Sequence, residues 1–249
     1  MYQILKLLKF PNIFHAFSEK EDGDLSTNFD LEAKIVTRRE KFLGKLNLRL
    51  DDCVKMQVAH GDEVVEANGK LKGISLRDWR KAIHVDGLVT SKKNTFLFLL
   101  IADCLPIILY DPVNEVVGLV HAGWKGVDLN IVGKTIEKLG VLYETNPNNL
   151  VIGIGPAARK DSFIKENPSQ KNDLKWKDFL EAMDGNYYKV DFVGLAKKQL
   201  VDSGIRKENI FDCGIDTVKD NRFFSHVREG KLPPNKQGRF ACVVGIRSV

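Results

Sequence analysis

Two short segments carry the residues best suited to chemistry. Cys104 lies in Ala-Asp-Cys-Leu-Pro, and His121 lies in Val-His-Ala-Gly-Trp. Between them, residues 111–114 (Asp-Pro-Val-Asn) have the composition of a turn. If they form a hairpin loop, Tyr110 pairs with Glu115, and Cys104 then lies opposite His121. Opposed residues share one face of a sheet, with Cβ atoms about 4.5–5.5 Å apart, so a thiolate and an imidazole could bind one metal ion.

His60 is the expected third ligand. It ends a strand-like run and precedes Gly61, which breaks the strand and can let the imidazole turn inward. Three protein ligands with one open position are typical of a catalytic zinc site, where the pKa of bound water falls to about 7. We therefore predict a catalytic metal centre formed by His60, Cys104 and His121.

Lys125 is the candidate for a phosphate contact. It lies between Gly123 and Gly126 at the start of a predicted helix, where exposed amides and a lysine can hold an anion. A tight turn with an ordinary surface lysine explains the same residues equally well. Residues 153–156 (Gly-Ile-Gly-Pro) lack the third glycine of a dinucleotide-binding fingerprint, and we interpret them as a turn.

The composition is that of an ordinary globular protein. The 249 residues are 43% hydrophobic and 29% charged, with a net charge of +5. Acids interrupt the basic residues, so no stripe for nucleic acid is present, and the charge supports only a mild attraction for small anions. No apolar run approaches the roughly 20 residues of a membrane span, and the N-terminal residues do not resemble a signal peptide. We expect no nucleic-acid or membrane partner and a cytoplasmic location.

The four cysteines predict no disulfide bond, because they are far apart and form no Cys-x-x-Cys pair. Apart from Cys104, they are expected to be plain reduced thiols: Cys53, Cys213 and Cys242.

The apolar periodicity predicts one α+β domain over residues 1–249, built around a mixed sheet without regular βαβ repeats. Helices are expected over 31–46, with Asn28 or Asp30 as the cap, from Leu129 to Leu139 after Gly126, and over 173–184 and 191–203; residues 74–83 are expected to form a loop or a short helix. Strands are expected over 54–65 with an interruption at His60-Gly61, and over 96–101, 105–110, 116–120, 150–154, 210–213, 222–226 and 240–246.

Taken together, the motifs resemble the YfiH family, also called the laccase-domain or polyphenol-oxidase-like family. The matching segments follow the family's order along nearly the whole chain: His15–Ser18, Gln57–Gly61, Ala102–Pro106, Val120–Gly126, Gly155-Pro156, Phe223–Ser225 and Gly238-Arg239. The sequence departs from the family's pattern outside the three metal positions, at Lys20, Leu100, Ile101, Asp161, Ser162 and Val227.

The resemblance implies a single catalytic domain with mixed β-sheets flanked by helices, of α-β-β-α type, and one zinc ion at His60, Cys104 and His121. It also implies a purine nucleoside phosphorylase that acts on adenosine, inosine, guanosine and methylthioadenosine, with adenosine deaminase activity. The expected partners are purine nucleosides and phosphate, and the expected state is a monomer or homodimer.

Three other functions stay open. A copper-dependent polyphenol oxidase could use the same three ligands with Met56 as an axial ligand, but five histidines without a His-x-His pair cannot build a multicopper cluster, so bound copper would be adventitious. A metal-free hydrolase could use Cys104 as nucleophile and His121 as base. A non-catalytic binding or peptidoglycan-editing factor could use zinc only to tie three segments together.

Overall fold

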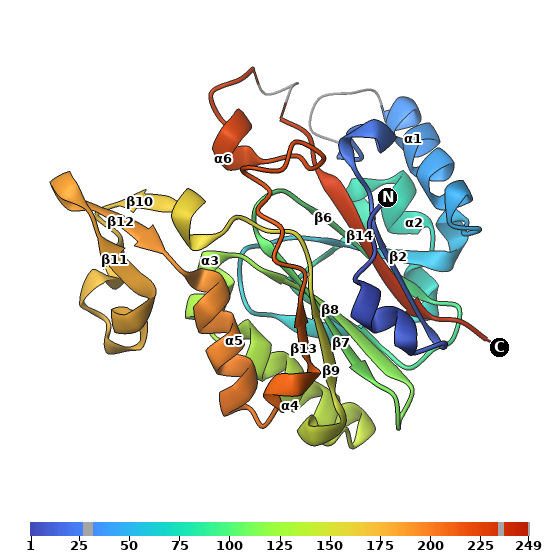
Figure 1. The fold of residues 1–249 in the computed structure, drawn as a ribbon. Coiled ribbons are helices and arrows are strands. Elements are labelled where there is room, and N and C mark those ends of the chain that lie inside the picture. The colour runs from blue at the N-terminus through green and yellow to red at the C-terminus, as the bar shows by residue number, and fades with distance from the viewer. Residues whose placement is uncertain (27–31, 234–236, 249) are drawn as a thin grey trace.

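Two large β-sheets pack face to face between layers of helices (Figure 1). The computed structural model describes residues 1–26, 32–233 and 237–248. Over these residues, the five-stranded sheet has the order β1-β14-β6-β2-β4, and the six-stranded sheet has the order β13-β9-β7-β8-β5-β3. Both sheets combine parallel and antiparallel pairs. The predicted α+β class, with helices flanking mixed sheets in one domain, is confirmed.

The strands are short and are connected mostly by 3₁₀ turns and loops. The five-stranded sheet contains β1 (Ile13–Phe17), β2 (Cys53–Gln57), β4 (Ile83–His84), β6 (Phe96–Ile101) and β14 (Phe240–Ile246). The six-stranded sheet contains β3 (Val64–Glu66), β5 (Gly87–Thr90), β7 (Leu105–Asp111), β8 (Val116–Ala122), β9 (Val151–Ile154) and β13 (Ile210–Asp212). A third sheet, of β10 (Ile164–Glu166), β12 (Tyr187–Val190) and β11 (Leu180–Ala182), protrudes from the body (Figure 1).

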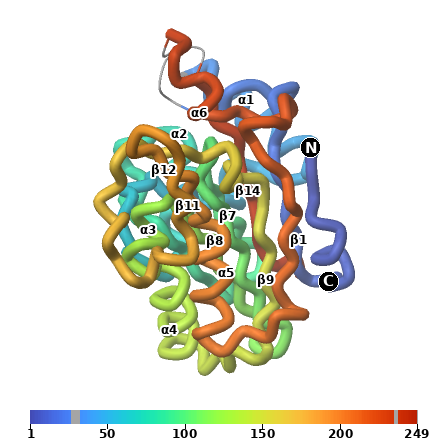
Figure 2. Tube along the Cα trace, turned by 60° about the vertical axis from the view of Figure 1, so that its left-hand side comes forward, coloured from blue at the N-terminus to red at the C-terminus, as the bar shows by residue number. Residues whose placement is uncertain are grey.

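The helices cover the outer faces of the two large sheets. The five-stranded sheet is covered by α1 (Glu32–Lys45) and α2 (Ile74–Arg77). The six-stranded sheet is covered by α3 (Trp124–Asp128), α4 (Ile131–Tyr143) and α5 (Phe192–Asp202). The last helix, α6 (His226–Glu229), lies at one end of the molecule (Figure 1). Both chain ends lie on the side of β1 (Figures 1 and 2). None of the described helices is long and apolar enough to cross a membrane.

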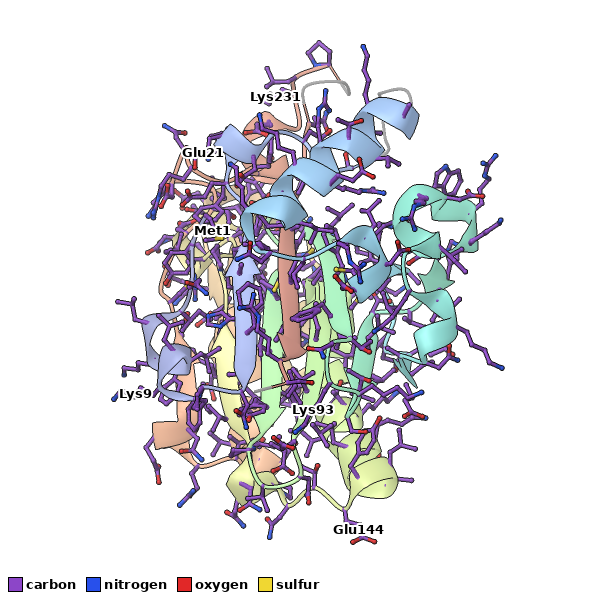
Figure 3. All side chains as sticks on the ribbon, turned by 90° about the vertical axis from the view of Figure 1, so that its right-hand side faces the viewer. Met1, Lys9, Glu21, Lys93, Glu144 and Lys231 are labelled. Atoms are coloured by element: carbon purple, nitrogen blue, oxygen red, sulfur yellow. The ribbon has the colours of Figure 1, made fainter. Side chains whose placement is uncertain are left out.

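Strand alternation divides the core into three layers. In β7, Ile107 and Leu109 face α4 and α5, whereas Ile108 and Tyr110 face the other sheet. A third cluster lies between α1 and the outer face of the five-stranded sheet and includes Phe42. Figure 3 shows α1 lying across the strands of this sheet, with Lys231 at one end of the molecule and Lys93 and Glu144 towards the other.

Most predicted elements are confirmed, with altered bounds. The helix over 31–46 is α1, and its proposed caps, Asn28 and Asp30, lie outside the described residues. The helix expected from Leu129 begins at Ile131, and Gly126 lies inside the separate helix α3. Residues 74–83 form α2, a 3₁₀ turn and the start of β4. The strand expected over 54–65 is two strands, β2 and β3, in different sheets.

The helix predicted over residues 173–184 is wrong. This segment forms a 3₁₀ helix, Leu174–Phe179, and then strand β11, which pairs with β12. Trp176 is buried, and its Nε1 donates to Asp128 Oδ1 at 2.7 Å. Packing of this one side chain against α3 fixes the backbone, so tertiary contacts override the local helical spacing.

The strand predicted over residues 222–226 is also wrong. The segment is irregular and leads into α6, whose first turn is capped by Ser225 Oγ accepting from the backbone of Arg228 at 3.1 Å. The Arg228 guanidinium donates to the carbonyl oxygens of Thr217 at 2.6 Å and Phe223 at 2.6 Å. Side-chain donors therefore satisfy backbone acceptors that a strand partner would otherwise satisfy.

Candidate metal centre

Three chain segments bring the predicted ligands together at one end of the two sheets. His60 follows β2, Cys104 directly precedes β7, and His121 lies near the end of β8. One ligand atom from each residue lies within 4.8 Å of the other two. The imidazole rings of His60 and His121 are 5.0 Å apart between centroids and nearly perpendicular, at 88°.

The hairpin register differs from the predicted one, but the shared face is preserved. Asp111 pairs with Val116, and Pro106 lies opposite His121. Glu115 has φ of 49° and belongs to the turn, so the loop is 112–115 rather than 111–114. Cys104 is two residues before the position opposite His121. Because side chains alternate with a period of two, this shift keeps both ligands on the face between the sheets.

His60 adopts a backbone conformation that its neighbours hold in place. Its φ is 56°, in the left-handed region, so His60 rather than Gly61 makes the turn. The backbone amides of residues 59–61 all donate to the carboxylate of Asp86, at 3.2, 3.0 and 2.7 Å. These three bonds fix the loop that carries the exposed imidazole of His60 to the site.

Asp86 also contacts His121, the buried candidate ligand, and no sequence pattern pointed to this aspartate. Its Oδ1 lies 2.8 Å from Nδ1 of His121, and its carbonyl oxygen accepts from the His121 backbone at 2.7 Å. Burial opposes ionisation of Asp86, but the hydrogen bonds from His121 and Gly61 lower the pKa of its carboxyl below the usual value. Since Nδ1 contacts this carboxylate, Nε2 of His121 is left for a metal.

Asp103 connects the cysteine segment to α6. It is buried, with φ of 74°; its Oδ1 accepts from Thr217 Oγ1 at 2.6 Å, and its Oδ2 accepts from the backbone of Val227 at 2.6 Å. These contacts hold the start of α6 beside the cysteine, which places His226 on the wall of the same cavity.

The electrostatics favour a thiolate beside a charged imidazole. Burial alone would raise the pKa of Cys104, but the charge of His121 and hydrogen bonds from His121 and His60 lower it to about 6. Burial would lower the pKa of His121, but the Cys104 thiolate and the hydrogen bond to Asp86 raise it to about 9. The thiolate is the form of cysteine that binds metal.

Gly123 leaves space for an ion among the ligands. A Cβ atom at this position would lie 3.2 Å from Sγ of Cys104, 3.5 Å from Cε1 of His121 and 3.7 Å from Cδ2 of His60. A soft sulfur and two imidazole nitrogens are donors that zinc prefers, at about 2.0–2.3 Å from the ion. The three residues therefore fit a zinc ion with one position open.

The three residues border a cavity of about 410 Å³. The cavity wall includes the three candidate ligands, the ends of β2 and β6, and single residues before α1, in α6 and before β14. The lining residues are Ser26, Lys55, Met56, Gln57, Val58, His60, Leu100, Ile101, Ala102, Cys104, His121, His226 and Arg239. The family departures at Leu100 and Ile101 thus line the candidate substrate site. Lys125 is exposed in the first turn of α3 and is not part of this wall.

The two packed sheets and a His/Cys/His cluster facing a cavity define a metal-binding α+β protein of laccase-domain type. The family described as "Multi-copper polyphenol oxidoreductase laccase" matches residues 20–247, and the chain belongs to this family. The predicted relationship to YfiH proteins is confirmed.

Relatives and solved structures agree with this assignment. "Purine nucleoside phosphorylase YlmD" of Bacillus subtilis (strain 168) is 28% identical over 92% of this chain and 84% of that protein. A "Purine nucleoside phosphorylase" of Xylella fastidiosa (strain 9a5c) is 30% identical over 77% of this chain and 71% of its own length. The "hypothetical protein YfiH" of Bacillus licheniformis has a TM-score of 0.84 at 25% identity, covering 94% and 93% of the two chains. YlmD from Geobacillus stearothermophilus has the same fold, with a TM-score of 0.85 at 23% identity and coverage of 96% and 93%.

Proposed function

We propose that the protein is a zinc-dependent purine nucleoside phosphorylase that also deaminates adenosine. The observation that carries the proposal is the convergence of His60, Cys104 and His121 at a cavity of about 410 Å³. The names of two relatives support the nucleoside substrates. Adenosine, inosine, guanosine and methylthioadenosine are the proposed nucleosides, and phosphate is the co-substrate.

Each residue of the site has a defined task in this proposal. His60, Cys104 and His121 would hold the zinc ion, which would supply Lewis acidity and lower the pKa of a water molecule to the neutral range. Asp86 fixes the ring of His121. His226 lines the cavity and offers an imidazole that can hold or transfer a proton near the purine. Lys125, the phosphate contact predicted from the sequence, is exposed and lies outside the cavity wall, so it has no task inside the cavity.

One experiment tests the proposed function. Zinc-loaded protein is incubated with adenosine, with and without phosphate, and the products are separated by chromatography. Inosine should form without phosphate, and adenine or hypoxanthine should appear when phosphate is added. If zinc-replete protein gives none of these products, the proposal fails and the non-catalytic binding or editing factor becomes the leading function.

A second candidate function, a metal-free hydrolase, is favoured by the contacts of His121 with Cys104 on one side and Asp86 on the other. The thiol pKa of about 6 and the 2.8 Å contact between His121 and Asp86 match the logic of a cysteine nucleophile with an oriented base. Elemental analysis of protein purified without added metal separates the two functions. One zinc per chain favours the phosphorylase; metal-free protein whose hydrolytic activity is abolished by thiol alkylation favours the hydrolase.

Copper oxidation has weaker support. In the described part of the chain, one group of three or more His, Cys, Asp or Glu side chains lies close enough together to hold a metal ion, and it contains two of the five histidines. A multicopper cluster needs more imidazole ligands than this group offers. Because divalent copper outcompetes zinc at nitrogen and sulfur ligands, we attribute any oxidase activity to copper acquired in place of zinc.

A further inference from the structure

A buried lysine lines the cavity from the side of the five-stranded sheet. Lys55 lies in β2, between Val54 and Met56, which face the core between the sheets, so it points to the opposite face of the strand. Its side chain is 2% exposed, and Nζ donates to Oε1 of Gln57 at 2.9 Å. An ammonium group has three donors, so this contact uses one of them.

Two guanidinium groups add positive charge. Arg39 in α1 is 1% exposed and donates to the carbonyl oxygens of Leu25 and Leu76. Its Nη2 is buried and has no hydrogen-bond partner in the described part of the chain. Arg239 lines the cavity and uses Nη1 on the nearby carbonyls of residues 237–238. Among the side chains that the structure describes, those of residues 1–26, 33–233 and 237–248, no carboxylate forms an ion pair with Lys55, Arg39 or Arg239.

Burial lowers the pKa of Arg39 to about 10, and the charge of Asp24 opposes this shift. The Asp24 carboxylate, however, is hydrogen-bonded to other groups. Oδ1 of Asp24 accepts from the backbone amides of Ser26 at 2.9 Å and Arg239 at 2.8 Å, and Oδ2 accepts from Ser26 Oγ at 3.0 Å. Burial, followed by the charge of Arg39, lowers the pKa of Lys55 to about 7. Buried charges are normally paired, and here an anion would supply the missing partner.

We propose that Lys55 and Arg239 form an oxyanion subsite that binds a phosphate group inside the cavity, with Arg39 adding positive charge behind Lys55. The ligand chemistry is a phosphate dianion, either inorganic phosphate or the phosphoryl group of a nucleotide. Its role in phosphorolysis rests on the proposed function, and it places the co-substrate against Lys55 rather than Lys125. The cavity then holds the metal ligands and the phosphate subsite in one space.

Calorimetric titration of inorganic phosphate into the zinc-loaded full chain tests this inference. Lys55→Met should weaken phosphate binding at least tenfold without changing zinc content, because Met keeps an unbranched side chain of similar length. Lys9→Met is the charge-matched control, since Lys9 is an exposed lysine of the N-terminal 3₁₀ helix (Leu5–Lys9) outside the cavity wall. Arg239→Gln gives a second variant should the Lys55 protein not fold.

The possible outcomes separate this inference from the proposed function. Phosphate binding that depends on Lys55, without any phosphorolysis, supports the subsite and rejects only the function. If Lys55→Met and Arg239→Gln catalyse phosphorolysis with an unchanged phosphate KM, the subsite is overturned. The subsite is also overturned if phosphate binding is lost in Lys125→Met and in no other variant. Titration with AMP distinguishes inorganic phosphate from the phosphoryl group of a nucleotide. If AMP binding requires Lys55 and inorganic phosphate does not bind, the oxyanion subsite is supported but its role in phosphorolysis is overturned.

Discussion

Asp86 is the residue that positions two of the three proposed metal ligands. Its carboxylate contacts Nδ1 of His121 and accepts the amides that position His60. A carboxylate behind a ligating imidazole fixes the orientation of the ring and increases its basicity. One buried side chain therefore sets both the direction of Nε2 of His121 and the left-handed backbone of His60.

Replacing Asp86 with Asn should weaken zinc binding about 10- to 100-fold, the usual cost of losing such a partner. The Asn amide keeps the shape but offers one acceptor oxygen where the carboxylate offers two, so the amides of residues 59–61 and His121 cannot all be satisfied. Competition with a chelating dye measures the zinc affinity, and circular dichroism checks the fold. Unchanged affinity in a folded variant would show that Asp86 is not needed to orient the ligands.

Cys104→Ala should remove most of the bound zinc, because two imidazoles retain the ion poorly once the thiolate is lost. The expected result is well below half of one zinc per chain by elemental analysis after dialysis against metal-free buffer. The fold should persist, since the thiol is half-buried at the edge of the core between the sheets. Full zinc occupancy in this variant would reject the predicted ligand set.

At the scale of elements, the β7–β8 hairpin shows what the sequence could and could not predict. Two apolar runs around a turn predicted the strands and the shared face of Cys104 and His121. The register was wrong by two residues because Asp111 caps the turn with its side chain while its backbone still pairs with Val116. An error of one residue would have separated the ligands, whereas an error of two preserved the site.

Gly123, directly after β8, should be needed for metal binding although it carries no side chain. In Gly123→Ala, the new Cβ would meet the sulfur of Cys104 at 3.2 Å, so the ligands must move apart and zinc affinity should fall at least tenfold. Gly44→Ala is the matched control, because Gly44 is exposed in α1 with nothing within 4 Å of an added Cβ. Its zinc affinity should equal that of the parent, and equal affinities in both variants would contradict the steric argument.

Contacts between distant segments account for what the sequence did not predict. Asp86 and Asp103 act through partners far along the chain, such as Thr217 for Asp103, and no spacing rule connects such residues. The helix expected over 173–184 was lost to the packing of Trp176 against Asp128. Local periodicity thus located the layers and the ligands, whereas the residues that orient them required the folded molecule.

The remaining cysteines should matter for stability and not for metal. Cys53 and Cys242 are fully buried in two apolar clusters, and Cys213 is partly buried against the cluster that contains Cys242. The triple Ser variant should keep one zinc per chain but lose about 1–3 kcal/mol for each buried hydroxyl that finds no partner. Urea denaturation measures the loss of stability. Loss of zinc from a variant that remains folded would show that one of these thiols contributes to the site.

The oxyanion subsite should reduce the stability of the whole molecule at neutral pH. The folded pKa of Lys55, about 7, lies below its ordinary value of 10.5, so the unfolded chain binds more protons between these values and stability increases with pH. One such group changes the free energy of unfolding by up to about 1.4 kcal/mol per pH unit. Arg39, with a pKa of about 10, stays charged up to pH 9.

Lys55→Met should therefore be more stable than the parent at pH 7, and the difference should shrink as the pH rises to 9. Urea denaturation of both proteins at pH 7, 8 and 9 measures this difference in the free energy of unfolding. The contributions of ionisable groups that the two proteins share cancel in the difference. Added phosphate should reduce the difference at pH 7, because the anion binds the folded parent through Lys55 and stabilises it by mass action. A difference that is independent of both pH and phosphate would mean that folding does not lower the pKa of Lys55 and that Lys55 binds no anion.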